Sequence, residues 1–325
     1  MAKRGADDDK FPLLTYLDSL VDNLRRLVSA AVSGEDADAV HDARVATRRL
    51  KAATDLVCEC VSGRSRRPFD RVGKCLRRQL GPLRDLDVML EHLSEIKQPS
   101  FQAGVRWIEE RLRHCRQETV LSAADNAPPA RILARLGSWW GLRHEIKEAQ
   151  DSIGEMLAQS VHLQLDAFVE QAHDLVAERH NDPHQLRIAG KSLRYTLEMS
   201  REHGVKLGAA VLWQFKRMQN ALGLWHDYAV LAERILRESV ESDLALHEPH
   251  LQSELLGVAQ LSLRKSEAQL KKMATLWKQR GEELAQTIRQ AFPLTEHFHD
   301  SPQADAEEAA KTEISPAPSP AAPAA

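Results

Sequence analysis

The chain has 325 residues, of which 43% are hydrophobic and 28% charged, and its formal net charge at pH 7 is −3. Aromatic residues make up only 5% of this globular composition, and the abundance of Leu, Ala, Glu, Gln and Arg favours helices over a β-rich core. No secretory signal and no apolar run near the roughly 20 residues of a membrane span are present, so we expect a cytoplasmic protein with no membrane partner.

Helical periodicity predicts four helices in the first part of the chain, after a flexible N-terminus at residues 1–10. Gly34 is expected to end the first helix, Asp36 or Asp38 to cap the second, and Gly63 to end the second. Gly81-Pro82 is expected to kink or interrupt the third. The four helices are predicted at residues 13–32, from the cap to about 61, 67–97 and 101–123.

The second part repeats this plan after a break at Asn126-Ala-Pro-Pro129. Asn181-Asp-Pro183 is expected to cap its motif-bearing helix, and no alternating strand pattern occurs in the sequence. The helices are predicted at 144–179, 184–203, 209–239 and 249–291. Residues 126–143 are expected to be a linker, and residues 293–325, rich in Pro, Ala and Glu, a disordered acidic tail.

One pattern, H-x-x-R-[VI]-A-x-[RK]-x-L-[KR], occurs twice, starting at His41 and at His184. On a helix its ionisable positions fall within an arc of roughly 80°, and its apolar positions point the other way. A second pattern, L-G-x-x-[RH]-D, occurs at Leu80 and at Leu222. The offsets of 143 and 142 residues between copies indicate a duplication. The sequence therefore predicts an all-α fold of two pseudo-twofold-related four-helix bundles, at 11–125 and 144–292.

Positive charge is concentrated around the two motifs. Residues 41–84 contain twelve Lys and Arg against four Asp and Glu, and residues 183–227 contain seven against three. A basic zone inside an acidic chain indicates an anionic partner.

The two paired motifs, in the same order, resemble those of the CHAD family, the conserved histidine α-helical domain. The resemblance covers roughly residues 11–291 and identifies the chain as a stand-alone member. It implies two four-helix bundles with a basic channel between them that binds inorganic polyphosphate. It also implies association with cytoplasmic polyphosphate granules. The second copy departs from the first, with Ser192 in place of Arg49 and His226 in place of Arg84, so we expect its anion binding to be weaker or more pH-dependent.

Arginine binds phosphate oxygens through paired hydrogen bonds, and lysine contributes a mobile point charge. The polyphosphate-binding residues are accordingly expected to be the cations and histidines of the four motif segments. Asp85 and Asp227 are expected either to orient a neighbouring cation or to cap a turn. In the first half the candidates are His41, Arg44, Arg48, Arg49, Lys51, Lys74, Arg78 and Arg84; in the second they are His184, Arg187, Lys191, Arg194, Lys216 and His226.

Other interpretations stay open from the sequence. A basic helical face can simply be solvated. A phosphohydrolase acting on polyphosphate or organic phosphates would use acidic pairs such as Asp85 and Asp87, but the repeat has Ala229 in place of Asp87. A nucleic-acid-binding module would need interleaved aromatic residues, which are absent between residues 41 and 61. We therefore expect no catalytic residue, metal or cofactor, and only weak, charge-driven binding of nucleic acid.

Overall fold

A computed structural model describes residues 11–178, 182–241 and 243–294. Over these ranges the chain is helical with no strand, which confirms the all-α prediction. The expectations for residues 1–10 and for most of the tail lie outside the described residues. Each described helix is too short or too polar to cross a lipid bilayer.

The first half begins with a helix that ends where the sequence predicts. Gly34 has a φ of 66°, a left-handed conformation that glycine adopts without strain, and it closes the first helix. The carboxylate of Asp36 then accepts hydrogen bonds from two backbone N–H groups of the second helix. The elements of this half are α1 (Pro12–Ser33), α2 (Ala37–Leu56), α3 (Gly63–Ser94), the 3₁₀ turn η2 (Pro99–Phe101), α4 (Gln102–Asn126), α5 (Pro129–Leu136) and α6 (Trp139–Glu148).

Two boundary predictions in this half are wrong. Helix α2 ends at Leu56, and Gly63 is the first residue of α3 rather than a terminator, because the Ser62 side chain caps that helix. Pro82 does not interrupt α3, which runs on to Ser94. Buried residues before and after this proline keep α3 packed against its neighbours, and this packing offsets the lost backbone hydrogen bond.

The second half contains α7 (Gln150–Val176), α8 (Pro183–Glu202), α9 (Ala209–Glu241), α10 (Leu244–His247) and α11 (Pro249–Ala291). The stretch 126–143, expected to be a linker, forms α5 and the first half of α6. Pro129 occupies the first turn of α5, where its missing N–H is no loss, and Ile132 and Leu136 one turn apart are buried. A proline pair that reads as a break is therefore the start of a helix.

The buried residues form three hydrophobic clusters, whereas two bundles predict two. The first joins α1, α2 and the first part of α3 to the end of α4, α5, α6 and the start of α7, and it includes Met199 of α8; the second joins the rest of α7, α8, the start of α9 and the end of α11. The third is shared, because it joins the end of α3 and α4 of the first half to the end of α9 and the start of α11. The two halves thus have a common core at one end.

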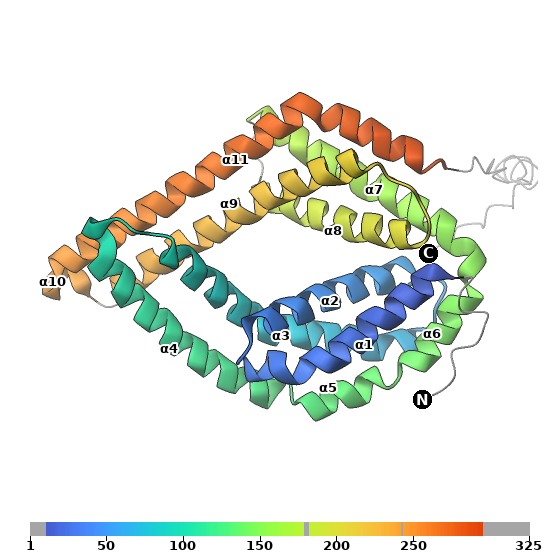
Figure 1. The fold of residues 1–325 in the computed structure, drawn as a ribbon, viewed down its shortest axis with the longest axis horizontal. Coiled ribbons are helices and arrows are strands. Elements are labelled where there is room, and N and C mark those ends of the chain that lie inside the picture. Colours follow the sequence, from blue (N-terminus) through green and yellow to red (C-terminus); the bar gives the residue numbers. More distant parts are fainter. Residues whose placement is uncertain (1–10, 179–181, 242, 295–325) are drawn as a thin grey trace, which may run out of the picture. The chain divides into compact units, whose positions relative to one another are not determined.

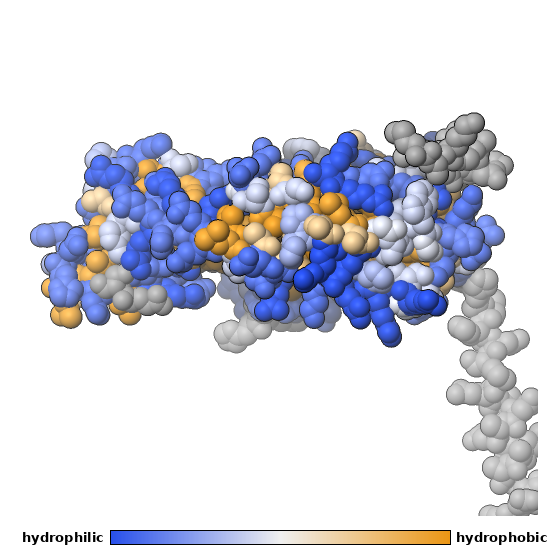
Figure 2. All heavy atoms as spheres, turned by 90° about the horizontal axis from the view of Figure 1, so that it is seen from below, coloured by the Kyte–Doolittle hydropathy of each residue, from blue (hydrophilic) through white to orange (hydrophobic). Residues whose placement is uncertain are grey.

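The repeat places equivalent helices opposite each other. Helix α2 contacts α8, and α3 contacts α9, so the motif-bearing helices face the interior of the described fold, α2 and α3 from one side and α8 and α9 from the other (Figure 1). The outer face in Figure 2 is mainly hydrophilic, with an apolar area near its middle.

Candidate anion-binding site

The site is assembled from four helices of the two halves. The histidine motifs lie on α2 and α8, and the L-G-x-x-[RH]-D motifs lie on α3 and α9. The apolar faces of α2 and α8 are buried, since Ala43, Ala46 and Leu50 belong to the first cluster and Leu186 and Leu193 to the second. Their burial fixes the rotation of each helix and turns the cationic face away from its own core.

Arg44 lies directly over the backbone of α3. Its Nη1 donates a hydrogen bond of 3.4 Å to the carbonyl of Arg77, and a Cβ atom built on Gly81 would lie 3.0 Å from the same nitrogen. Gly81 therefore leaves room for the Arg44 guanidinium. Burial, followed by the positive charge of Arg48, lowers the pKa of Arg44 to about 10, so Arg44 is still charged at pH 7.

Arg48 links the two halves electrostatically. It lies on α2, and its charge contributes to lowering the pKa of both Arg187 and Lys191 on α8, after burial and, for Lys191, after Arg187. Within the described part of the chain, Arg48 forms no ion pair or hydrogen bond. The first motif therefore presents an uncompensated guanidinium toward the second.

Burial also lowers pKa values in the second half of the site. Burial, followed by the charges of Arg187 and Arg48, lowers the pKa of Lys191 to about 7. Burial, again followed by Arg187, lowers the pKa of His226 to about 4. The His226 ring lies 5.7 Å from that of His184, centroid to centroid. At neutral pH His226 is therefore uncharged, and Lys191 is only partly charged.

His41, at the start of the first motif, is exposed and shares this environment. Burial of part of its ring, followed by the charge of Arg84, lowers its pKa. His41 and Arg84 thus come together from α2 and α3, as the repeat of the motifs predicts for their counterparts His184 and His226.

The two motif aspartates lie among these cations. The charge of Asp85 acts on both Arg44 and Arg187, which places it between the two halves. Burial raises the pKa of Asp227, and the neighbouring Arg187 opposes that rise. Arg187 Nε is buried without a hydrogen-bond partner among the described residues. An orienting role for either aspartate stays a prediction, since no hydrogen bond joins them to a motif cation in the described structure.

A cleft of about 390 Å³ opens beside this cluster, between α2, α8 and α9. In it the Glu198 carboxylate accepts a hydrogen bond of 2.8 Å from Arg49 Nε, and its other oxygen lies 3.5 Å from Arg194 Nε. The hydrogen bond and charge of Glu198 outweigh the burial of Arg49, so its pKa is raised. The lining residues are His41, Val45, Arg49, Arg194, Leu197, Glu198, Arg201, Leu212, Phe215 and Lys216.

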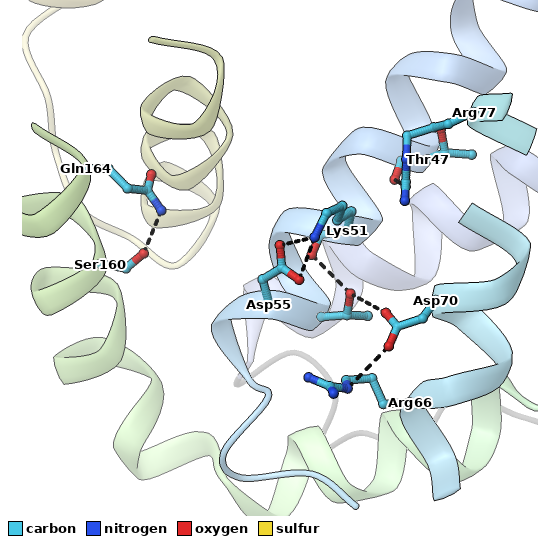
Figure 3. Close-up of polar contacts among 9 residues, drawn as sticks. Thr47, Lys51, Asp55, Arg66, Asp70, Arg77, Ser160 and Gln164 are labelled. Atoms are coloured by element: carbon cyan, nitrogen blue, oxygen red, sulfur yellow. Dashed lines mark hydrogen bonds and ion pairs between the residues drawn. The ribbon is translucent and has the colours of Figure 1, made fainter. Parts of the chain in front are cut away.

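Three predicted residues are not brought into this arrangement. Lys51 Nζ lies 2.6 Å from Asp55 Oδ2, beside the Arg66–Asp70 ion pair, so its charge is compensated locally (Figure 3). Lys74 and Arg78 are exposed on α3 and form no hydrogen bond or ion pair with a described residue. The helical arc alone does not distinguish these cations from those that face the other half, because the acidic partner of Lys51 lies one turn later on the same face.

Sequence reasoning missed Glu198, Arg201 and Arg77. Glu198 lies one turn after Arg194 on the motif face of α8, so extending the helical face by one turn would have found it. Arg77 donates a hydrogen bond to the carbonyl of Thr47, and no motif position marks it (Figure 3). Among the described residues there is no group of three or more His, Cys, Asp or Glu side chains arranged to hold a metal ion.

Comparisons with known proteins agree with this architecture. A family model of the CHAD domain matches residues 15–236. The structure is similar to the CHAD domain from the plant Ricinus communis, with a TM-score of 0.55, 23% identity, and coverage of 86% of this chain and 90% of that one. It is also similar to PptA from Streptomyces chartreusis, with a TM-score of 0.55, 15% identity, and coverage of 82% and 98%. Among curated proteins, none matches.

Fold and site together define an all-α protein in which the helices that carry the two copies of each motif contact each other. The chain belongs to the CHAD domain family, because the family model covers well over half of its length. The resemblance drawn from the paired motifs is thereby confirmed.

Proposed function

We propose that this protein binds inorganic polyphosphate, without catalysis, at the cationic cluster between α2, α3, α8 and α9. The observation that carries the proposal is the mutual effect of cations from the two halves. Arg48 on α2 lies close enough to Lys191 and Arg187 on α8 to help lower the pKa of both. Membership of a family whose resemblance implies polyphosphate binding supports the same ligand.

The charge arrangement favours a linear polyanion over a compact one. The ionisable positions of one motif extend over ten residues of helix, or roughly 15 Å, which corresponds to several consecutive phosphates. Two cations about 7 Å apart repel each other by about 0.6 kcal/mol in water and about 2 kcal/mol at an effective dielectric constant near 20. A bound polyanion relieves this repulsion, and its counterions are released, so the affinity is expected to fall steeply with salt.

The environment of the acidic residues supports binding rather than hydrolysis. A metal-dependent phosphohydrolase needs clustered carboxylates free to hold the ion. Asp87, the one acidic neighbour of Asp85 in the motif, forms an ion pair of 2.6 Å with Arg116. Asp85 itself lies in the field of Arg44 and Arg187, which repels a divalent cation. By the same resemblance, we propose that the protein associates with polyphosphate granules in the cytoplasm.

The test is a titration with long-chain polyphosphate of the wild type and of the double variant Arg44→Glu plus Arg187→Glu. We expect the affinity of the double variant to fall at least a hundredfold at physiological salt, because two attractive contacts become repulsive. Arg48→Glu tests the same site if the double variant fails to fold, because Arg48 forms no hydrogen bond with a described residue. Lys278→Glu is the control, since it reverses one exposed charge on α11 outside the cluster.

Unchanged affinity in a folded double variant, or equal losses for Arg48→Glu and Lys278→Glu, would exclude the proposed site. Single-stranded RNA is the competing ligand in the same assay. Competition by RNA as strong as that by polyphosphate would favour a nucleic-acid-binding module instead. Release of orthophosphate from polyphosphate in the presence of Mg²⁺ or Mn²⁺, lost in Asp85→Asn, would favour the phosphohydrolase.

A further inference from the structure

Glu198 is an acidic residue inside a site that is otherwise suited to anions. Its carboxylate is held between Arg49 of α2, at 2.8 Å, and Arg194 of α8, at 3.5 Å. The cleft around it is lined by three further cationic or ionisable side chains, His41, Arg201 and Lys216. A carboxylate between two guanidinium groups has the geometry that a bound phosphate would have.

The Glu198 side chain is accessible from the cleft. Its side chain is 29% exposed and borders the cleft, so an incoming anion can reach both arginines. The charge of Glu198 also contributes, after burial, to raising the pKa of Tyr16 on α1. A small anion that enters the cleft therefore meets a resident negative charge and two arginines that already have a partner.

We propose that Glu198 is an internal competitor that makes the site selective for long polyphosphate chains over short phosphate anions. This inference rests on the proposed function. The Glu198 carboxylate is tethered beside Arg49 and Arg194, so its effective concentration there is high, and a free anion must displace it. Glu198 thus weakens the binding of orthophosphate and tripolyphosphate in the cleft.

A long chain is affected much less. It gains its contacts along the cluster formed by Arg44, Arg48, Arg187 and Lys191 and can leave the Arg49–Glu198–Arg194 bridge intact, so most of its binding free energy is independent of Glu198. A short anion contacts only part of that row at once, so the two cleft arginines make up a larger share of the contacts open to it. Rejection of the wrong ligand by a built-in repulsive group is a common route to specificity.

The chain offers a matched control in Glu238. This carboxylate is also bound by two arginines, Arg111 of α4 and Arg234 of α9, each at 2.6 Å. Its side chain is only 7% exposed, it does not line the cleft, and its ion pair with Arg111 joins α9 to α4. Glu238→Gln changes the net charge by the same amount as Glu198→Gln without altering the cleft.

The experiment measures the affinities of the wild type, Glu198→Gln and Glu238→Gln for long-chain polyphosphate, tripolyphosphate and orthophosphate at one salt concentration. Glutamine keeps an oxygen that accepts the hydrogen bond from Arg49, so the link between α2 and α8 persists, and thermal melting checks the fold. We expect Glu198→Gln to raise the affinity for tripolyphosphate at least fivefold and that for the long chain less than threefold. Glu238→Gln is expected to raise neither.

The outcomes separate this inference from the proposed function. If Glu198→Gln leaves tripolyphosphate binding unchanged or weaker while the wild type binds the long chain, Glu198 is only a structural link and the inference is wrong. An equal gain in Glu238→Gln would reduce the effect to net charge and would also overturn it. If the wild type binds no long chain at all, the proposed function itself fails.

Discussion

The two halves of the site share a sequence motif but differ in charge at neutral pH. In the first half the equivalent positions carry Arg44, Arg48 and Arg84, and the pKa of Arg44, although lowered by burial to about 10, leaves it charged. In the second half burial lowers the pKa of Lys191 to about 7 and that of His226 to about 4. The same backbone arrangement therefore carries arginine at all three positions in the first half, but one arginine, Arg187, and two titratable residues in the second.

The difference follows from residue type as much as from burial. Arginine keeps its charge when it is desolvated, whereas lysine and histidine release a proton. His226 of the second copy, which stands in place of Arg84, is thus charged only at a pH below its pKa, whereas Arg84 is always charged. We infer that the first half supplies most of the affinity and that the second half makes it depend on pH.

Exchanging these two residues should have the largest effect. We expect His226→Arg to raise the affinity for long-chain polyphosphate about tenfold at pH 7.5, because one charge-assisted contact is worth about 1.5 kcal/mol. Arg84→His should lower the affinity by a similar factor. Calorimetric titration measures the polyphosphate affinity of each variant. Equal affinities of the two variants would show that the two halves contribute alike.

The pH dependence of polyphosphate binding tests whether the charge of Lys191 contributes to the affinity. Because the pKa of Lys191 is about 7, its charged fraction falls from about nine-tenths at pH 6 to about one-tenth at pH 8. We expect the affinity for polyphosphate to fall about fivefold over that range and proton uptake to accompany binding near pH 7.5. Lys191→Arg should flatten the curve, and the same slope in this variant would contradict the assignment to Lys191.

The stability of the ligand-free protein should also depend on the charge of Lys191. It should rise with pH, whereas the affinity for polyphosphate falls. The pKa of Lys191 in the folded protein, about 7, lies below the usual 10.5, so between these values the unfolded chain binds more protons. The contribution of Lys191 to stability therefore rises as the pH rises from 7 to 10. We expect Lys191→Met to raise the melting temperature at pH 6 and to raise it less at pH 9.5. A constant difference across this range would contradict the assignment.

The motif glycines provide the smallest and most local comparison. A Cβ atom at Gly81 would lie 3.0 Å from Arg44 Nη1, whereas one at Gly223 would have no atom within 4 Å. Gly81→Ala should displace the guanidinium and lower polyphosphate affinity about twofold. Gly223→Ala should leave the affinity unchanged and raise the free energy of unfolding by about 0.5 to 1 kcal/mol, the helix propensity difference. Similar affinity losses in both variants would argue against a specific role of Gly81.

The helices and the repeat were readable from the sequence, because apolar spacing and motif offsets are local properties. The C-terminal end of α2 and the helical nature of residues 129–143 were not, since the cap at Ser62 and the proline at the start of α5 resemble loop signals. In the site, the helical arc of the motif predicts which faces of α2 and α8 carry the cations. It could not reveal that Asp55 compensates Lys51 or that Glu198 lies between Arg49 and Arg194, because these contacts depend on rotamers and on the partner helix.

The hydrophobic cluster shared by α3, α4, α9 and α11 affects how much conformational entropy the protein loses when it binds a ligand. It fastens the two halves at one end, and α6 leads directly into α7 at the other, so the opposing walls are held at a set spacing before any ligand arrives. Little ordering entropy then remains to be lost on association. We expect amide hydrogen exchange in α3 and α9 to change little when polyphosphate is added.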